Sequence, residues 1–357
     1  MTATLFILGL AALVAGAELL VRGASKLAVG FGISPLVVGL TVVAFGTSSP
    51  EMAVSVQSAL AGNVDIAMAN VVGSNIFNIL FILGVCALIA PLVIADQLIR
   101  QEVPIMIGAS ILAMLFALDG GLSRIDGIVL FALLVAYTLF LIVQARRAPK
   151  GALSAEFDDE LSKAARAWDR HWSVQVGLIA VGLVLLVQGS NWLVDAAIVF
   201  AKQLGVSEVV VGLTIIAAGT SMPEVATSIF ATLRGHRDIA VGNVIGSNTF
   251  NILGVLGLSA IVAPADLAVA PSLRAFDIPV MLAVALASLP IFFTGRSIAR
   301  WEGVVFLGFY AIYTGYLILM AQKHDALNTF GAIVISFVAP VLVVTLVVTL
   351  LNAQRKR

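Results

Sequence analysis

The sequence has little charge and almost no cysteine or histidine for its length. Only 11% of its 357 residues are Asp, Glu, Lys or Arg, whereas soluble domains carry about a quarter. The formal net charge is zero, so there is no basic excess to attract a nucleic acid. The single cysteine, Cys86, has no partner for an internal disulfide. These scarcities exclude an ordinary soluble domain, a disulfide-stabilised fold and a nucleic-acid-binding protein.

The sequence is rich instead in long apolar runs. Apolar residues make up 61% of the chain, and a helix needs about 20 of them in succession to cross a lipid bilayer. No Lys or Arg precedes Arg22, so we expect the first run to be a retained helix and not a cleaved signal peptide. The pattern predicts eleven transmembrane spans, near residues 3–27, 33–61, 65–90, 102–118, 124–145, 173–203, 207–233, 238–263, 275–294, 299–321 and 328–352.

Basic residues are distributed unevenly between these spans. Sixteen of the 20 Lys and Arg residues follow odd-numbered spans, and four follow even-numbered spans. Because basic loops stay in the cytoplasm, we expect the N-terminus outside and the C-terminus in the cytoplasm, in a plasma (inner) membrane. The charge-dense segment 146–172 divides the chain in half, and we expect it to be a cytoplasmic linker.

One segment of the chain occurs twice. Residues 37–84 align without a gap to residues 210–257, at a constant offset of 173 and with 29 identities in 48 positions. Each copy belongs to a unit of five spans, and because five is odd the second unit starts from the opposite side of the membrane. The predicted fold class is all-α and polytopic. It has two inverted five-helix repeats with broken central helices, at 1–145 and 173–322, and one extra C-terminal helix at 328–352.

The repeat puts carboxylates in the middle of predicted spans. Glu51 ends the sequence GTSSPE, and Glu224 ends its twin GTSMPE. A charged side chain at that depth costs roughly 2.5–3.5 kcal/mol and should face the protein interior or a cavity. The proline in each motif should break the helix and free the carbonyl four residues earlier, at Gly46 and Gly219. Such carbonyls would be hard oxygen ligands beside the hydroxyls of Thr47, Ser48, Thr220 and Ser221.

A second repeated motif, GSNIFN and GSNTFN, adds hydroxyls and amides. Its serine and last asparagine are four residues apart and share a helix face; these pairs are Ser74 with Asn78 and Ser247 with Asn251. Each of them taken alone fits helix packing as well as ligand binding. Asn75 and Asn248 lie on another face, and we expect them to join helices. We expect Gly73 and Gly246 to let backbones approach closely.

The type of ion follows from the donor atoms. The three histidines lie in predicted loops and the cysteine is isolated, which excludes a zinc-type site. Ca²⁺ prefers about 6–8 oxygen ligands, and two carboxylates would neutralise one such ion. Na⁺ also takes carbonyl and hydroxyl oxygens, and shared ligands would make the two ions compete. The pattern therefore predicts exchange of Na⁺ for Ca²⁺ and points to no cofactor and no obligate protein partner.

The two motifs resemble the α-repeats of the calcium/cation antiporter superfamily, in particular its prokaryotic sodium/calcium exchanger branch. The resemblance covers residues 1–322 and implies a transporter, not an enzyme, with four central cation sites and a sliding pair formed by the first and sixth helices. It implies ligands from the side chains of Glu51, Glu224, Thr47, Thr220, Ser48, Ser221, Ser74, Ser247, Asn78 and Asn251, and from the backbone carbonyls of Ala44 and Ala217. Many relatives carry an aspartate in place of Asn251, so ion stoichiometry and K⁺ dependence stay open.

Three other functions share parts of this pattern. A Ca²⁺/H⁺ antiporter would use the buried glutamates as proton carriers, whereas the many neutral oxygens favour Na⁺. A channel needs a continuous pore, whereas inverted repeats with broken helices favour alternating access. An intramembrane hydrolase is disfavoured because Ser48 and Glu51 have no histidine or lysine base in these spans. We therefore expect a secondary antiporter that extrudes Ca²⁺ by using the sodium gradient.

Overall fold

The structure, a computed structural model, describes residues 2–31, 33–147, 171–203, 217–293 and 295–322, with 327 and 331 as single residues, and these described residues are almost entirely helical. Eight described helices are long and apolar enough to cross a bilayer, and a bent helix pair forms a ninth span. These nine coincide with nine of the predicted spans. The span predicted at 207–233 is described only from residue 217, and the span at 328–352 lies outside the described residues apart from residue 331.

The first half contains the break that the sequence predicts. Helix α1 (Thr2–Phe31) is followed by a span whose first arm comprises α2 (Pro35–Val38), the π-helical turn η1 (Gly39–Val43) and α3 (Ala44–Thr47). The second arm, α4 (Ser49–Leu60), is bent by 45° from the first. Pro50 lies in the first turn of α4, where its missing N–H removes no helical hydrogen bond. The remaining elements are α5 (Val64–Phe77), η2 (Asn78–Ile82), α6 (Leu83–Ile89), η3 (Leu98–Glu102), α7 (Val103–Phe116) and α8 (Arg124–Arg147).

The second half repeats this order. Helix α10 (Trp172–Gln203) takes the place of α1, and α12 (Ala217–Gly219) and α13 (Met222–Leu233) are the described parts of the second broken span. Pro223 again lies in the first turn after the break. The remaining elements are α14 (Arg237–Phe250), η6 (Asn251–Leu256), α15 (Gly257–Val262), η7 (Leu273–Asp277), α16 (Ile278–Phe293) and α17 (Arg300–Ala321).

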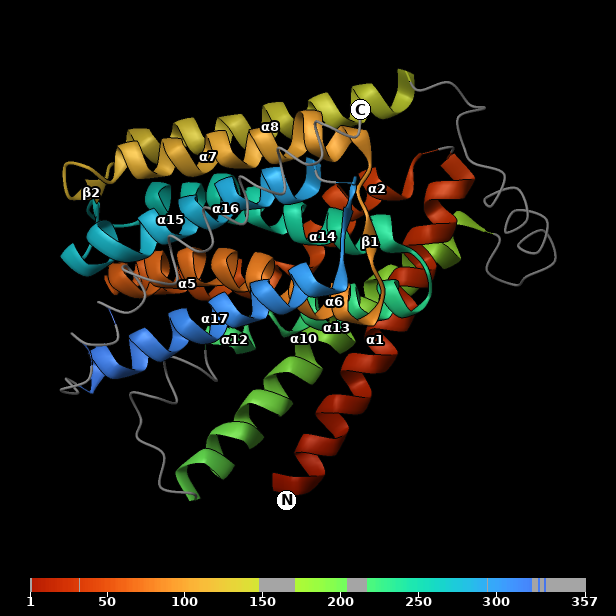
Figure 1. Ribbon diagram of the computed structural model, residues 1–357, viewed down its shortest axis with the longest axis horizontal. Coiled ribbons are helices and arrows are strands. Elements are labelled where there is room, and N and C mark those ends of the chain that lie inside the picture. The colour runs from red at the N-terminus through yellow and green to blue at the C-terminus, as the bar shows by residue number, and fades with distance from the viewer. Residues whose placement is uncertain are drawn as a thin grey trace.

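Short strands join loops at the two ends of the helix bundle (Figure 1). β1 (Leu92–Val93) pairs antiparallel with β4 (Ser297–Ile298), and β2 (Gly121–Leu122) pairs antiparallel with β3 (Leu267–Ala268). In the eleven-span numbering, the first ladder joins loops after odd-numbered spans and the second joins loops after even-numbered spans. The repeat exchanges β1 with β3 and β2 with β4, so it exchanges the two ends of the molecule. The predicted inversion of the two halves is therefore confirmed.

Helices α1 and α10 run side by side and extend away from the other helices toward the lower edge of Figure 1. A Cβ on Gly16 would lie 2.8 Å from the carbonyl oxygen of Gly182, and a Cβ on Gly182 would lie 2.8 Å from that of Gly16. Gly9 and Gly189 approach each other in the same reciprocal way, at 2.9 and 2.8 Å. Only glycine permits backbones this close, so the seven-residue spacing of these glycines fixes an antiparallel helix pair.

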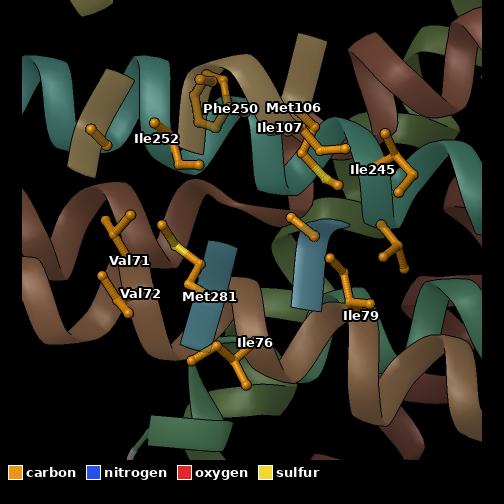
Figure 2. Close-up of a cluster of buried hydrophobic side chains, with 14 of the residues drawn as sticks. Val71, Val72, Ile76, Ile79, Met106, Ile107, Ile245, Phe250, Ile252 and Met281 are labelled. Carbon is orange, nitrogen blue, oxygen red and sulfur yellow. The ribbon is translucent and has the colours of Figure 1, made fainter. Parts of the chain in front are cut away.

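The core lies between α5–η2 and α14–η6. Figure 2 shows Ile76 and Ile79 of the first segment opposite Ile245 and Ile252 of the second, with Met281 of α16 beside them. All five side chains are at most 3% exposed. The two copies of the second motif lie on these two central segments, so the fold brings them together in the interior.

Candidate functional site

Each broken span puts a serine and a carboxylate at the beginning of a helix. Ser48 lies in the first break and Glu51 in the first turn of α4, while Ser221 lies in the second break and Glu224 in the first turn of α13. The beginning of a helix has free N–H groups and the positive end of the helix dipole, which favour a negatively charged side chain. Both glutamates are fully buried. The prediction that these carboxylates face the protein interior is confirmed.

Each carboxylate is held by a serine of the other repeat. Ser221 Oγ donates to Glu51 Oε1, and Ser48 Oγ donates to Glu224 Oε1, both at 2.8 Å. The second oxygen of each carboxylate, Oε2, is buried and accepts no hydrogen bond from any described residue. Leaving such an oxygen unpaired costs about 1–3 kcal/mol, and more when the group is charged. A cation bound between the repeats would offset that cost.

The serines of the second motif extend this arrangement. Ser74 Oγ lies 3.1 Å from Ser221 Oγ, and Ser247 Oγ lies 3.5 Å from Glu224 Oε1. Both serines are buried. The structure thus brings together two triads of side chains, each with residues from both repeats: Glu51 with Ser221 and Ser74, and Glu224 with Ser48 and Ser247.

Thr47 and Thr220 are held by asparagines that the sequence analysis did not single out. Thr47 Oγ1 donates to Asn243 Oδ1 at 3.1 Å, and Thr220 Oγ1 donates to Asn70 Oδ1 at 3.2 Å. Each asparagine also donates its amide N–H to a serine of its own repeat. Asn70 donates to Ser55 at 2.9 Å, and Asn243 donates to Ser228 at 3.0 Å. The signal was present in the sequence, because Asn70 and Asn243 are identical at the offset of 173.

Asn78 and Asn251 lie where their helices widen. The π-helical turns η2 and η6 begin at these two residues, and such turns are frequent at functional sites. Asn78 Nδ2 donates to Asn248 Oδ1 at 2.9 Å, and Asn251 Nδ2 donates to Asn75 Oδ1 at 3.1 Å. Asn75 and Asn248 also donate to each other's backbone carbonyl, both at 3.2 Å, which confirms that they join helices. The Oδ1 atoms of Asn78 and Asn251 are buried and accept no hydrogen bond within the described residues.

The backbone carbonyls at the breaks differ in their partners. The Ala44 carbonyl accepts from the N–H of Ser48 at 3.0 Å, with Thr47 Oγ1 3.4 Å away. The carbonyl at Gly219, which Pro223 should free, accepts from the hydroxyl of Ser190 on α10 at 2.6 Å. Ala217 is the first residue of α12. The freed carbonyl of Gly219 therefore has a protein partner, which makes it a weaker candidate ligand than the side-chain oxygens.

The chemistry of this site is that of hard oxygen donors. Its unpaired buried atoms are the Oε2 atoms of Glu51 and Glu224 and the Oδ1 atoms of Asn78 and Asn251. Over the described ranges, no three His, Cys, Asp or Glu side chains gather as a transition metal would require. Carboxylate, hydroxyl and amide oxygens arranged around two repeats suit a hard cation such as Ca²⁺.

Comparison with known proteins gives the chain a family context. A family model described as "Sodium/calcium exchanger protein" matches residues 1–143 and 174–319. The putative antiporter CaxA of Alkalimonas amylolytica is 39% identical over 325 residues, which cover 90% of this chain and 99% of the relative. The sodium/calcium exchanger MaX1 of Methanosarcina acetivorans is 34% identical, with 87% and 96% covered. The inner membrane protein YrbG of Escherichia coli is 37% identical, with 79% and 86% covered.

Comparison with solved structures also finds a sodium-calcium exchanger. The sodium-calcium exchanger NCX_Mj, soaked with 2.5 mM Na⁺ and 0.1 mM Ca²⁺, superimposes with a TM-score of 0.73 at 29% sequence identity. The match covers 87% of this chain and 96% of that structure. The same exchanger without Na⁺ and Ca²⁺ gives a TM-score of 0.74.

Proposed function

Because the chain belongs to the sodium/calcium exchanger family, we propose that it exchanges Na⁺ for Ca²⁺ by alternating access and uses the sodium gradient to extrude Ca²⁺. Family membership makes it a membrane antiporter of Ca²⁺ and another cation, and not an enzyme. The family resemblance in the sequence is thereby confirmed. Na⁺ as the counter-ion, the direction of transport and the ligands are the parts that we propose.

The observation that carries this proposal is the pair of buried carboxylates between the repeats. Glu51 and Glu224 each have one oxygen held by a serine of the other repeat and one oxygen without a partner among the described residues. Two negative charges match one Ca²⁺, and the surrounding neutral oxygens suit Na⁺ when Ca²⁺ is absent. We propose as ligands the side chains of Glu51, Glu224, Thr47, Thr220, Ser48, Ser221, Ser74, Ser247, Asn78 and Asn251, with the carbonyls of Ala44 and Ala217.

The moving element that we propose is the α1–α10 pair. Its glycine contacts make the two helices one body. On α10, the side chain of Leu183 packs over Gly46 at the first break, and that of Val194 packs over Gly219 at the second. These two residues are eleven positions apart on the helix, which is about 16 Å along the axis. A shift of the pair along its axis would displace both side chains from the breaks that they cover, so one rigid movement changes the cover at both breaks, as alternating access requires.

The position in the membrane is also a proposal. Asp96 and Arg296 form an ion pair of 2.7 Å at the end of the molecule that carries β1 and β4. The excess of basic residues in the loops at this end supports a cytoplasmic location, which puts the N-terminus outside and the C-terminus inside. We propose the inner membrane, the location in YrbG's description. We also propose two repeat units, 1–145 and 173–322, with 146–172 as linker and 328–352 as an additional helix.

The test is uptake of ⁴⁵Ca²⁺ into proteoliposomes loaded with Na⁺, compared with Na⁺-free vesicles and with an imposed pH gradient. We expect uptake to require internal Na⁺ and to be lost in Glu51→Gln and Glu224→Gln. The matched control is Glu102→Gln. Glu102 is also fully buried, but it lies on η3, where the hydroxyl of Tyr137 donates to it at 2.6 Å. Uptake that survives in both site variants would refute the site.

The second candidate is Ca²⁺/H⁺ exchange. The unpaired Oε2 atoms of Glu51 and Glu224 favour it, because a proton can bind a buried carboxylate oxygen as a cation does. Uptake driven by the pH gradient alone, with no requirement for Na⁺, would replace the sodium proposal with this one. Uptake that needs neither counter-ion would contradict both.

A further inference from the structure

The central segments α5 and α14 are joined by four asparagines, two from each repeat. Asn75 and Asn78 lie on one side, and Asn248 and Asn251 on the other. From their hydrogen bonds we infer that Asn75 and Asn248 are positioning residues, which hold the amide oxygens of Asn251 and Asn78 free to bind the transported cation. This inference rests on the proposed function, because it takes Asn78 and Asn251 as ligands.

The backbone of Asn248 fixes the orientation of the Asn75 amide. The carbonyl oxygen of Asn248 can only accept a hydrogen bond, so Asn75 has to present its Nδ2 there, and the distance is 3.2 Å. With Nδ2 used in this way, Asn75 Oδ1 necessarily points in its other direction, toward Asn251. An amide has one acceptor atom and one donor atom, so the orientation of Asn75 is no longer free.

The Asn75 amide in turn orients the amide of Asn251, the candidate ligand. Asn75 Oδ1 accepts only, so Asn251 has to present its Nδ2 to it, at 3.1 Å. The remaining atom of that amide, Asn251 Oδ1, is thereby turned away from Asn75. It is one of the buried oxygens without a partner in the described part of the chain. The other two asparagines are oriented in the same way. Asn248 Nδ2 donates to the Asn75 carbonyl at 3.2 Å, and Asn78 Nδ2 donates to Asn248 Oδ1 at 2.9 Å, which leaves Asn78 Oδ1 free.

The surroundings keep the amides from turning over. All four asparagines are at most 2% exposed, and Asn75 Nδ2 lies 3.7 Å from the sulfur of Met281, a core side chain that Figure 2 shows. Turning the Asn75 amide would bring its oxygen against the Asn248 carbonyl oxygen and its Nδ2 against the Nδ2 of Asn251. Both contacts would be repulsive in this buried setting, so one orientation is strongly favoured.

The arrangement also selects the residue type at both ligand positions. An ionised aspartate at 78 or 251 could not donate to the Oδ1 of the facing asparagine, and two acceptors would then face each other. The four bonds hold together with neutral donors at both positions, either amides, as in this chain, or a protonated carboxylic acid whose O–H donates. The asparagines thus keep these two ligands neutral, which leaves the ligand set with the two negative charges of Glu51 and Glu224.

The test is a double-mutant cycle on the apparent KM for Ca²⁺, measured with whichever counter-ion drives uptake. Asn251→Ala and Asn75→Ala should each raise KM by about tenfold, the size expected for one lost contact. If Asn75 acts through Asn251, the double variant should be within about twofold of Asn251→Ala, not a hundredfold worse than wild type. The control is the pair Asn75 and Ser48, which share no hydrogen-bond partner and should combine additively.

Asn248 and Asn78 supply an independent second cycle, which should show the same coupling. Should an alanine variant fail to fold, Asn75→Leu and Asn248→Leu replace it, because leucine has nearly the shape of asparagine without its hydrogen bonds. Asparagines that only join helices would lower thermal stability and maximal rate and leave KM for Ca²⁺ unchanged; that result would overturn the inference, as would additivity in the two coupled pairs. A wild type that needs no Na⁺ would refute the counter-ion proposal alone, since the cycles use any driving ion.

Discussion

The hydroxyl of Ser221 should contribute to Ca²⁺ affinity by an amount that the structure sets. Ser221 Oγ donates to Glu51 Oε1 at 2.8 Å, and both residues are fully buried. A hydrogen bond to a charged group contributes about 1.5–3 kcal/mol, so Ser221→Ala should weaken Ca²⁺ binding by about 10- to 100-fold. Because Ser48 makes the same bond to Glu224, Ser48→Ala should give a loss of similar size.

The assay is equilibrium ⁴⁵Ca²⁺ binding to purified protein, together with KM from uptake, since KM equals a dissociation constant only when ions leave faster than the transporter turns over. Ser49→Ala is the control, because Ser49 directly follows Ser48 at the first break. Its side chain is exposed, and its hydroxyl donates to the Phe45 carbonyl at 3.2 Å, so we expect less than about a twofold change. An unchanged affinity in Ser221→Ala, or a loss in Ser48→Ala alone, would refute the reciprocal arrangement.

Three further predictions concern the moving pair, the orientation and a supporting residue. Gly16→Val should abolish exchange by forcing α1 away from α10, whereas Gly177→Val, on an exposed position with no described atom near its Cβ, should leave proteoliposome exchange intact. In intact cells, Asp119→Cys should react with a membrane-impermeant maleimide from outside, and the buried Cys86 of the parent should not. Asn70→Ala should raise KM for Ca²⁺ by about two- to tenfold, the effect of one neutral hydrogen bond that orients a threonine of the other repeat.

The features that the sequence predicted well are those that depend on spacing. An odd number of spans per repeat predicted the inversion, which the exchange of the β1–β4 and β2–β3 ladders confirms. Pro50 and Pro223 predicted the two breaks, because proline cannot continue a helix through its own turn. The close approach expected at Gly246 is also confirmed, since a Cβ there would lie 2.7 Å from the Leu40 carbonyl oxygen. At Gly73, the equivalent neighbour would be residue 213, which lies outside the described residues.

The features that the sequence did not predict depend on which side chains meet across the repeats. The polar residues of the motifs were found, but not that Ser221 binds Glu51 or that Ser48 binds Glu224, because pairing is decided by packing. The π-helical turn that begins at Asn78 has no pattern of its own in the sequence. Asn75 was taken as a residue that joins helices, which is correct, but its orientation of a neighbouring amide follows only from atomic contacts.

A pair of buried contacts outside the motifs was missed for another reason. The Tyr137 hydroxyl donates to Glu102 at 2.6 Å in the first repeat, and the Tyr313 hydroxyl donates to Asp277 at 2.8 Å in the second. Each tyrosine belongs to the fifth span of its repeat and each carboxylate to the fourth. The two carboxylates differ in type between the repeats, and both the carboxylates and the tyrosines stand at offsets other than 173, so a search for identities at that offset does not find them.

The central claim is that one set of oxygens, anchored by Glu51 and Glu224, binds Na⁺ and Ca²⁺ in turn. The most direct measurement is equilibrium binding of ⁴⁵Ca²⁺ to the purified protein while Na⁺ is raised at constant ionic strength, for wild type and for Glu224→Gln. The account predicts saturable Ca²⁺ binding in wild type that Na⁺ displaces completely, and no saturable binding in the variant. Ca²⁺ binding that is indifferent to Na⁺, or that persists unchanged in Glu224→Gln, would contradict it.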